Sequence, residues 1–130
     1  MENILKTHLN GLQHIGIPTD RMEETLEFYE KLGFDRAFET LNNGDKVVFL
    51  RLNDLVIETY ESKEAKNAYG AIEHIALDVD DVERVYKIIC DWGMNTLKEE
   101  IQFLPFWENG VRFFTIEGPN KEKVEFSQML

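Results

Sequence analysis

Two stretches of the chain align with each other without a gap: LQHIGIPTDRMEETLEFYEKLGF (residues 12–34) and IEHIALDVDDVERVYKIICDWGM (residues 72–94). Each begins with an alternating aliphatic run of strand length, passes through an acidic segment, and continues as a helical pattern that ends in glycine. The second copy starts close to the middle of the 130-residue chain. The sequence therefore predicts a structural unit that is present twice.

Helix signals occur at corresponding places in the two copies. Residues 20–23 and 80–83 both have the acid-x-x-Glu spacing of a capping box, in which a side-chain oxygen accepts from free N–H groups of the first turn. Apolar side chains then recur every three or four residues. Gly33 and Gly93 follow at the place where a left-handed residue commonly ends a helix. Each copy therefore predicts a strand, a helix and a stop.

Three further strand-like segments follow the glycine in each half, separated by turn-forming residues. They are FDRAFET (34–40), KVVFLRL (46–52) and LVIETYE (55–61) in the first half, and MNTLKEE (94–100), VRFFTI (111–116) and KVEFSQ (123–128) in the second. The half-unit is then βαβββ, which predicts an α+β protein with a curved sheet and helices on its outer face. We expect one domain over residues 1–130, with repeat halves at about 10–62 and 70–130.

The composition is that of an ordinary globular protein, with 43% hydrophobic and 30% charged residues. No apolar run approaches the roughly 18 residues of a membrane span, and the first residues lack the features of a signal peptide, so we expect a cytoplasmic location. The formal net charge of −11 repels phosphate backbones and anionic lipid surfaces. Nucleic-acid and membrane partners are therefore not expected, and a small molecule is.

Strand alternation places one histidine of each copy on the face opposite the aliphatic side chains. If the aliphatic residues pack under the helices, His14 and His74 face the inner surface. The residue two places further on is small in both copies, Gly16 and Ala76, which leaves room beside each imidazole.

The same alternation places one glutamate of each half on the inner face, in the last strand of the half. These residues are Glu58 in the segment 55–61 and Glu125 in the segment 123–128. Two imidazoles and two carboxylates around one divalent cation leave coordination positions open, and the set suits Ni²⁺, Co²⁺, Fe²⁺, Mn²⁺ or Zn²⁺. The alternative is a hydrogen-bonded structural histidine and a solvated glutamate in each half.

These residues and motifs resemble the vicinal oxygen chelate superfamily and, within it, glyoxalase I (lactoylglutathione lyase). The resemblance covers about residues 12–128 and implies a curved, incomplete mixed barrel, the glyoxalase/bleomycin resistance/dioxygenase-like fold. It also implies a divalent transition metal, Ni²⁺ or Co²⁺ first, with Zn²⁺, Fe²⁺ or Mn²⁺ as alternatives. The metal ligands that it implies are His14, Glu58, His74 and Glu125.

The activity that the resemblance implies is that of a metal-dependent lyase or isomerase, which converts a small hydroxycarbonyl or hemithioacetal substrate through an enediolate. Glu125 is then the base, and Glu58 is its partner on the opposite face of the substrate. The resemblance also implies a homodimer, with the metal site formed within one chain or shared between two. An extradiol-type dioxygenase and a small-molecule-sequestering protein are the alternative functions.

The sequence departs from the glyoxalase I pattern at two places. Pro18 and Ser62 stand where short bacterial glyoxalase I enzymes carry an Arg and an Asn that bind glutathione. The substrate can therefore contain a different thiol, or be a sugar-like or other small hydroxycarbonyl compound. The segment 103–107 contains aromatic residues that either wall a pocket or belong to the core or a dimer contact. Arg112 pairs either with an anionic substrate group or with solvent.

Overall fold

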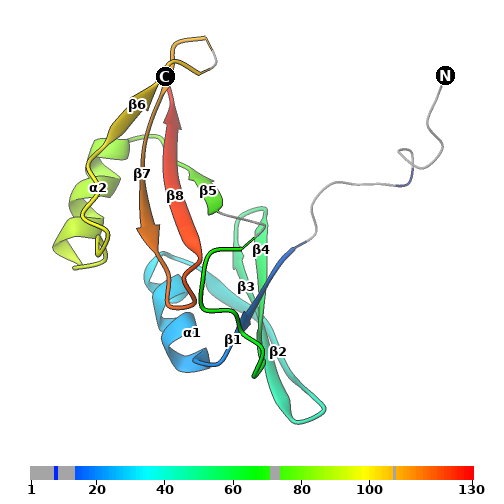
Figure 1. Ribbon diagram of the computed structural model, residues 1–130. Coiled ribbons are helices and arrows are strands. Elements are labelled where there is room, and N and C mark those ends of the chain that lie inside the picture. The colour runs from blue at the N-terminus through cyan, green and yellow to red at the C-terminus, as the bar shows by residue number, and fades with distance from the viewer. Residues whose placement is uncertain (1–7, 9–13, 71–73, 107) are drawn as a thin grey trace. The chain divides into compact units, whose positions relative to one another are not determined.

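The computed structural model describes residue 8 and residues 14–70, 74–106 and 108–130 of the chain (Figure 1). The chain divides into two compact units, with the boundary between Ala65 and Lys66. This boundary falls inside the polar segment 62–71 that joins the two sequence repeats. Each unit has its own four-stranded sheet and its own helix.

The first unit contains the elements β1, α1, β2, β3 and β4, and its strands lie in the order β1-β4-β3-β2. Strand β1 is parallel to β4, and the other neighbours are antiparallel. The element bounds are β1 Ile15–Thr19, α1 Met22–Lys31, β2 Asp35–Asn42, β3 Asp45–Leu52 and β4 Leu55–Glu61.

The second unit repeats this arrangement with the order β5-β8-β7-β6, and β5 is parallel to β8. Two mixed sheets, each with one helix, confirm the predicted α+β class and the two βαβββ repeats. The element bounds are β5 His74–Asp78, α2 Val82–Asp91, β6 Gln102–Leu104, β7 Val111–Glu117 and β8 Lys123–Met129.

The two helices end in the same way, as the glycine positions predict. Gly33 has φ +105° and Gly93 has φ +71°, so both residues occupy the left-handed region. The next residues, Phe34 and Met94, each donate a backbone N–H to the carbonyl five residues earlier at 3.1 Å. This bond pattern is the Schellman motif, and it turns the chain from the helix into the next segment. Neither helix of the described chain has the length and apolar character needed to cross a bilayer.

The predicted N-caps are wrong by one residue. Asp81, and not Asp80, is the N-cap of α2, and its carboxylate accepts from the Arg84 backbone N–H at 3.1 Å. Arg21, and not Asp20, is the N-cap of α1, and its side chain makes no capping hydrogen bond. The strand-to-helix connection is one residue longer than the capping-box spacing assumes, so the first acid of each segment lies outside the cap position.

The strand predicted at residues 94–100 is absent from this described segment, and the edge strand β6 begins only at Gln102. Side chains supply the hydrogen bonds that a neighbouring strand would otherwise make. The Asn95 amide donates to the Glu99 carbonyl at 3.0 Å and accepts from the Glu99 N–H at 3.2 Å. The Tyr86 hydroxyl donates to the same carbonyl at 2.8 Å. Such local bonds compete with a sheet ladder and hold the segment as a loop.

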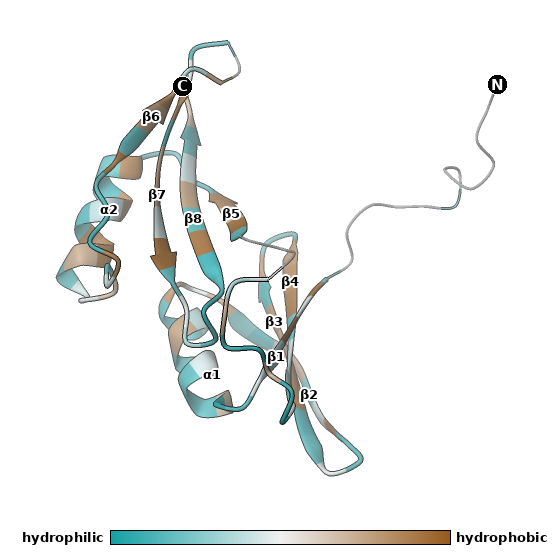
Figure 2. Ribbon diagram, viewed as in Figure 1, coloured by the Kyte–Doolittle hydropathy of each residue, from teal (hydrophilic) through white to brown (hydrophobic). Residues whose placement is uncertain are grey.

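The core of each unit lies between its helix and one face of its sheet, and Figure 2 shows hydrophobic residues along the strands of both sheets. Buried threonines join the core because their hydroxyls are bonded: Thr59 donates to the Ile17 carbonyl at 3.0 Å. The most deeply buried side chains include Leu26, Tyr29, Val48, Leu50 and Ile57 in the first unit, and Val82, Phe114, Ile116 and Val124 in the second.

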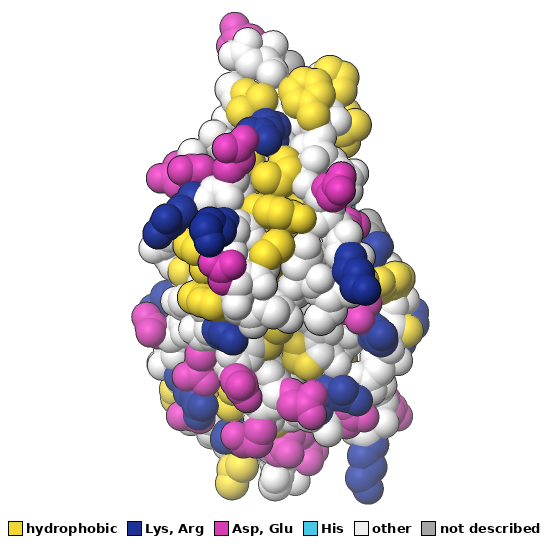
Figure 3. All heavy atoms as spheres, turned by 90° about the vertical axis from the view of Figure 1, so that its left-hand side faces the viewer, with side chains coloured by type: hydrophobic (Ala, Val, Ile, Leu, Met, Phe, Trp, Pro, Cys, Tyr) yellow, Lys and Arg dark blue, Asp and Glu magenta, His cyan; other side chains and the backbone are white. Residues whose placement is uncertain are grey.

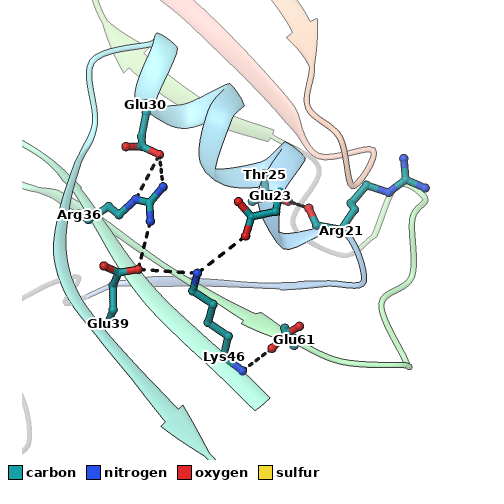
Figure 4. A network of polar contacts seen from close by, with 8 residues as sticks. All are labelled: Arg21, Glu23, Thr25, Glu30, Arg36, Glu39, Lys46 and Glu61. Atoms are coloured by element: carbon teal, nitrogen blue, oxygen red, sulfur yellow. Dashed lines mark hydrogen bonds and ion pairs between the residues drawn. The ribbon is translucent and has the colours of Figure 1, made fainter. Parts of the chain in front are cut away.

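Charged side chains link the helix of the first unit to its strands β2 and β3 (Figure 4). Arg36 on β2 bonds the carboxylates of Glu30 at 2.9 Å and Glu39 at 3.2 Å. The Lys46 ammonium on β3 lies 3.9 Å from Glu39 and 3.8 Å from Glu23. These exposed pairs add little stability individually, but they direct the Lys46 side chain to the helix side of the sheet.

A glutamate is half-buried in the turn between β7 and β8. One carboxylate oxygen of Glu122 accepts from the Asn120 N–H at 3.0 Å, whereas Oε2 is buried without a hydrogen-bond partner in the described structure. Burial raises the pKa of Glu122 above its usual value. A Cβ on Gly118 would overlap the Glu122 carboxylate, so the Glu122 side chain would have to move if Gly118 were replaced.

We expect the Glu122→Gln variant to be more stable than the wild type at pH 8, by about 1 kcal/mol. The folded protein holds the Glu122 proton to a higher pH than the unfolded chain does. Below the ordinary carboxyl pKa, Glu122 is protonated in both states and burial of its charge costs nothing. As the pH rises through the raised pKa of Glu122 in the folded protein, the charge forms and the free energy of unfolding of the wild type falls. Urea midpoints measured from pH 4 to 8 test this, with Glu64→Gln as the exposed control; parallel pH curves for wild type and Glu122→Gln would contradict it.

Candidate functional site

The first candidate pair joins the two parallel strands of the first unit. His14 immediately precedes β1, and Glu58 lies on β4, where it is paired in register with Gly16. The His14 Nε2 atom is 3.6 Å from the Glu58 Oε1 atom. The two side chains are 33% and 28% exposed, so both remain accessible to a ligand.

The second unit contains an equivalent pair. His74 is the first residue of β5, and Glu125 lies on β8, where it is paired in register with Ala76. The His74 Nε2 atom is 4.0 Å from the Glu125 Oε2 atom, and the side chains are 44% and 19% exposed. In both units the histidine thus stands two residues before the residue that faces the glutamate.

Burial along the strands confirms the predicted alternation. The neighbours of Glu58, Ile57 and Thr59, are fully buried, and so is Val124 beside Glu125. Each glutamate therefore projects from the sheet face opposite the helix, as predicted for an inner-face residue. A Cβ at Gly16 would make only ordinary contacts with the side chains around it, so the small residue leaves space that is not otherwise filled.

The distances within the pairs fit two ligands of one metal ion. With metal–ligand bonds of about 2.1 Å, two ligand atoms lie about 3 Å apart at a right angle and about 4.2 Å apart on opposite sides. The observed 3.6 and 4.0 Å fall between these limits. Among the residues that the structure describes, no three His, Cys, Asp or Glu side chains gather to hold a metal. Each unit by itself therefore offers two candidate ligands.

The surroundings of the two pairs differ. Phe49 on β3 is paired with Glu58, and its ring meets the His14 imidazole edge-on with centroids 5.7 Å apart. The corresponding residue on β7 is Thr115, which is paired with Glu125. The first pair therefore has an aromatic neighbour, and the second has a small polar one.

A cavity of about 310 Å³ adjoins Glu58 in the first unit. Tyr60 follows Glu58 two residues later on β4, so the two side chains lie on the same face of the sheet. The residues that line the cavity are Asn42, Asp45, Val47, Glu58, Tyr60, Glu61 and Ser62. The candidate site thus has space for a ligand beside one of its carboxylates.

The sequence model of the Glyoxalase/Bleomycin resistance protein/Dioxygenase superfamily matches residues 11–126. The chain belongs to this superfamily. YwbC of Bacillus subtilis (strain 168), an uncharacterized protein, is 35% identical over 127 residues, covering 90% of this chain and 96% of YwbC. The mitochondrial methylmalonyl-CoA epimerase of Dictyostelium discoideum is 28% identical over 96 residues, which cover 65% of this chain and 58% of the epimerase.

Solved structures support the superfamily fold. The fosfomycin resistance protein FosX from Listeria monocytogenes, solved with Mn(II) and a sulfate ion, superposes with a TM-score of 0.70 at 16% identity. The match covers 94% of each chain. At this identity the similarity establishes the shared architecture of the superfamily.

The sequence patterns did not identify all the residues that line the cavity. Strand alternation could have indicated Tyr60, since it lies two residues after Glu58 on the same strand. Asn42 and Asp45 carry no such signal, because only the β2–β3 hairpin brings them to the cavity. Ser62, one of the two departures from the glyoxalase I pattern, is a cavity residue.

The remaining candidates have other surroundings. The Arg112 guanidinium lies 2.9 Å from the Glu83 carboxylate of α2, so this arginine joins the strand β7 to the helix of its own unit. Phe103 and Phe106 are 56% and 54% exposed, so they do not belong to the core of the second unit. Trp107 lies outside the described residues. Figure 3 shows hydrophobic side chains gathered on the surface seen from the side of β6 and α2.

Proposed function

We propose that this superfamily member is a metal-dependent lyase or isomerase of the glyoxalase I type, acting on a small hydroxycarbonyl or hemithioacetal substrate through an enediolate. The observation that carries the proposal is the repetition of one His–Glu pair, at the same register and on the same sheet face, in both units. A single pair has a ready structural explanation. Two equivalent pairs supply two neutral imidazoles and two carboxylates, whose charge balances that of one divalent ion.

In this proposal the metal ligands are His14, Glu58, His74 and Glu125, and the metal is Ni²⁺ or Co²⁺, with Zn²⁺, Fe²⁺ or Mn²⁺ suited to the same donors. The two pairs meet within one chain or across a homodimer. When bound, such an ion supplies a Lewis acid for two neighbouring substrate oxygens and stabilises negative charge that develops on them. The fosfomycin resistance protein of the same fold was solved with Mn(II), which supports a metal in this architecture.

The protein's own part in the reaction is proton transfer by carboxylates. Glu125 takes the proton from the carbon between the two oxygens, and the proton then returns to the adjacent carbon. Glu58 stands on the opposite face of the substrate. Both side chains are partly exposed on the sheet face away from the helices, so a substrate can reach them.

The Glu58 position favours this reaction over the other activities of the superfamily. Ring-cleaving dioxygenases and fosfomycin-resistance enzymes typically lack a glutamate at this place, and methylmalonyl-CoA epimerases usually have a glutamine. The partial match to an epimerase nevertheless supports chemistry of the same kind, since proton removal beside a carbonyl is common to both reactions. Exchange of a substrate C–H for deuterium in D₂O, with no isomerised product, would favour epimerisation.

Elemental analysis of the protein as isolated, followed by turnover of methylglyoxal with several thiols, tests the proposal. We expect close to one divalent transition metal per four-ligand site and loss of that metal in the Glu58→Gln and Glu125→Gln variants. Protein that contains no metal and does not bind Ni²⁺, Co²⁺ or Zn²⁺ would refute the metal centre. Oxygen consumption with a catechol would favour the dioxygenase alternative, and ligand binding without turnover would favour a sequestering protein.

A further inference from the structure

The cavity beside Glu58 is polar and acidic. Three of its seven lining residues are acidic, namely Asp45, Glu58 and Glu61; the others are Tyr60, Ser62, Asn42 and Val47. No Lys, Arg or His side chain occurs among the described lining residues. Since Glu58 is a proposed metal ligand, a negatively charged group in the rest of the cavity would meet the like charges of Asp45 and Glu61 and no cationic side chain of the described lining.

The cation nearest in sequence is engaged on the other side of the sheet. Lys46 lies between two lining residues, Asp45 and Val47, but its ammonium is directed toward Glu23 and Glu39 on the helix side (Figure 4). Strand alternation explains this direction, since successive side chains point to opposite faces. The Lys46 side chain thus does not supply a hydrogen bond to a ligand in the cavity.

The backbone of Lys46 helps to position the acidic wall. Its N–H donates to the Glu61 carboxylate, which holds this acceptor at the cavity. The Ser62 hydroxyl oxygen accepts from the Glu64 N–H at 3.1 Å, so its proton is available to a ligand. Carboxylates only accept hydrogen bonds. The cavity therefore offers mainly acceptors, and it suits a ligand that is rich in donors.

We propose that this cavity binds the part of the substrate remote from the reacting carbons, and that this part carries hydroxyl or ammonium groups and no carboxylate or phosphate. The inference rests on the proposed function in placing the reaction at Glu58. It names the substrate class of the enzyme: hydroxycarbonyl compounds, or hemithioacetals of thiols, with a polyhydroxylated or amine-bearing tail. Thiols with free carboxylates, such as glutathione, are poor partners for this site.

Hemithioacetals of methylglyoxal with three small thiols test the selectivity. We expect kcat/KM for 1-thioglycerol and 2-(dimethylamino)ethanethiol to exceed that for thioglycolate by about tenfold. The Asp45→Asn/Glu61→Gln double variant should lose most of this preference, because it removes two charges while the amide carbonyl introduced at position 61 can still accept from the Lys46 N–H. Asp54→Asn, in the exposed turn between β3 and β4 and outside the cavity, should keep the wild-type preference.

A binding measurement separates this inference from the proposed function. Amide shifts of ¹⁵N-labelled protein as isolated are followed during titration with glycerol, 2-(dimethylamino)ethanol or methanesulfonate. We expect the first two to shift the amides of Asp45 and Ser62 and methanesulfonate to leave them in place. If glycerol and 2-(dimethylamino)ethanol shift these amides, methanesulfonate does not, and no thiol is turned over, the proposed function is overturned and the cavity preference is upheld. Equal shifts by methanesulfonate, or equal turnover with thioglycolate, would overturn the cavity preference.

Discussion

Replacing Glu125 with glutamine is expected to lower kcat for hemithioacetal turnover by about 10² to 10⁴-fold. The amide occupies the same volume as the carboxylate but cannot take a proton from carbon. Glu125 is 19% exposed, and its strand neighbours Val124 and Phe126 are buried, so the substitution changes the chemistry of the inner face and leaves the core intact. Measurement of kcat with metal content in the same preparations separates loss of the base from loss of the metal.

Two comparisons sharpen this experiment. Glu64→Gln removes an exposed carboxylate outside the site and is expected to keep the wild-type kcat. Glu125→Asp shortens the side chain and retains the basic group, so it should recover part of the activity that Glu125→Gln loses. Full activity of the Glu125→Gln variant at matched metal occupancy would show that another group takes the proton.

The His14→Ala and His74→Ala variants are each expected to weaken Ni²⁺ or Co²⁺ binding by more than about a hundredfold. Each change removes one nitrogen donor from the proposed set and leaves the partner carboxylate without its neighbour at 3.6 or 4.0 Å. Both imidazoles are partly exposed, so circular dichroism should show a folded protein in both variants. Competition with a chromogenic chelator measures the affinities; wild-type affinity in either variant would remove that histidine from the metal centre.

A mixture of the two histidine variants shows whether one chain or two form the site. If His14 of one chain acts with His74 of another, a mixed dimer regains one intact set of four ligands, and activity reappears after the variants are unfolded and refolded together. If both histidines act within one chain, every site in the mixture lacks one ligand and the mixture stays inactive. As a control, wild-type protein is unfolded and refolded in the same way, and the activity that it recovers sets the reference value.

Most of the fold could be predicted from the sequence because its signals are local and occur twice. The glycines at 33 and 93 predict the helix ends, and both occupy the left-handed region. The alternating runs predict which strand residues face the core, as the burial of Ile57 and Val124 confirms. The segment 94–100 is the exception, since the Asn95 side chain satisfies the Glu99 backbone groups in place of a strand.

The candidate site could likewise be predicted only in part. Period-two alternation in the sequence predicts that His14 and Glu58, and likewise His74 and Glu125, share a sheet face. The pairing of the β1 and β4 strands, and of β5 and β8, has no local signal, because it joins residues more than 40 positions apart. This register brings the imidazole and carboxylate atoms within 4.0 Å in both units.

The sequence by itself determined the repeated βαβββ unit, the helix ends and the two residue types on each inner face, since these follow from steric preferences and side-chain alternation along a few neighbouring residues. Only the tertiary structure decided the parallel register that makes the His–Glu pairs, the neighbours Phe49 and Thr115, and the acidic cavity beside Glu58. Those features depend on contacts between segments far apart in the chain. Such contacts are selected by packing of the whole unit, which no short stretch of sequence records.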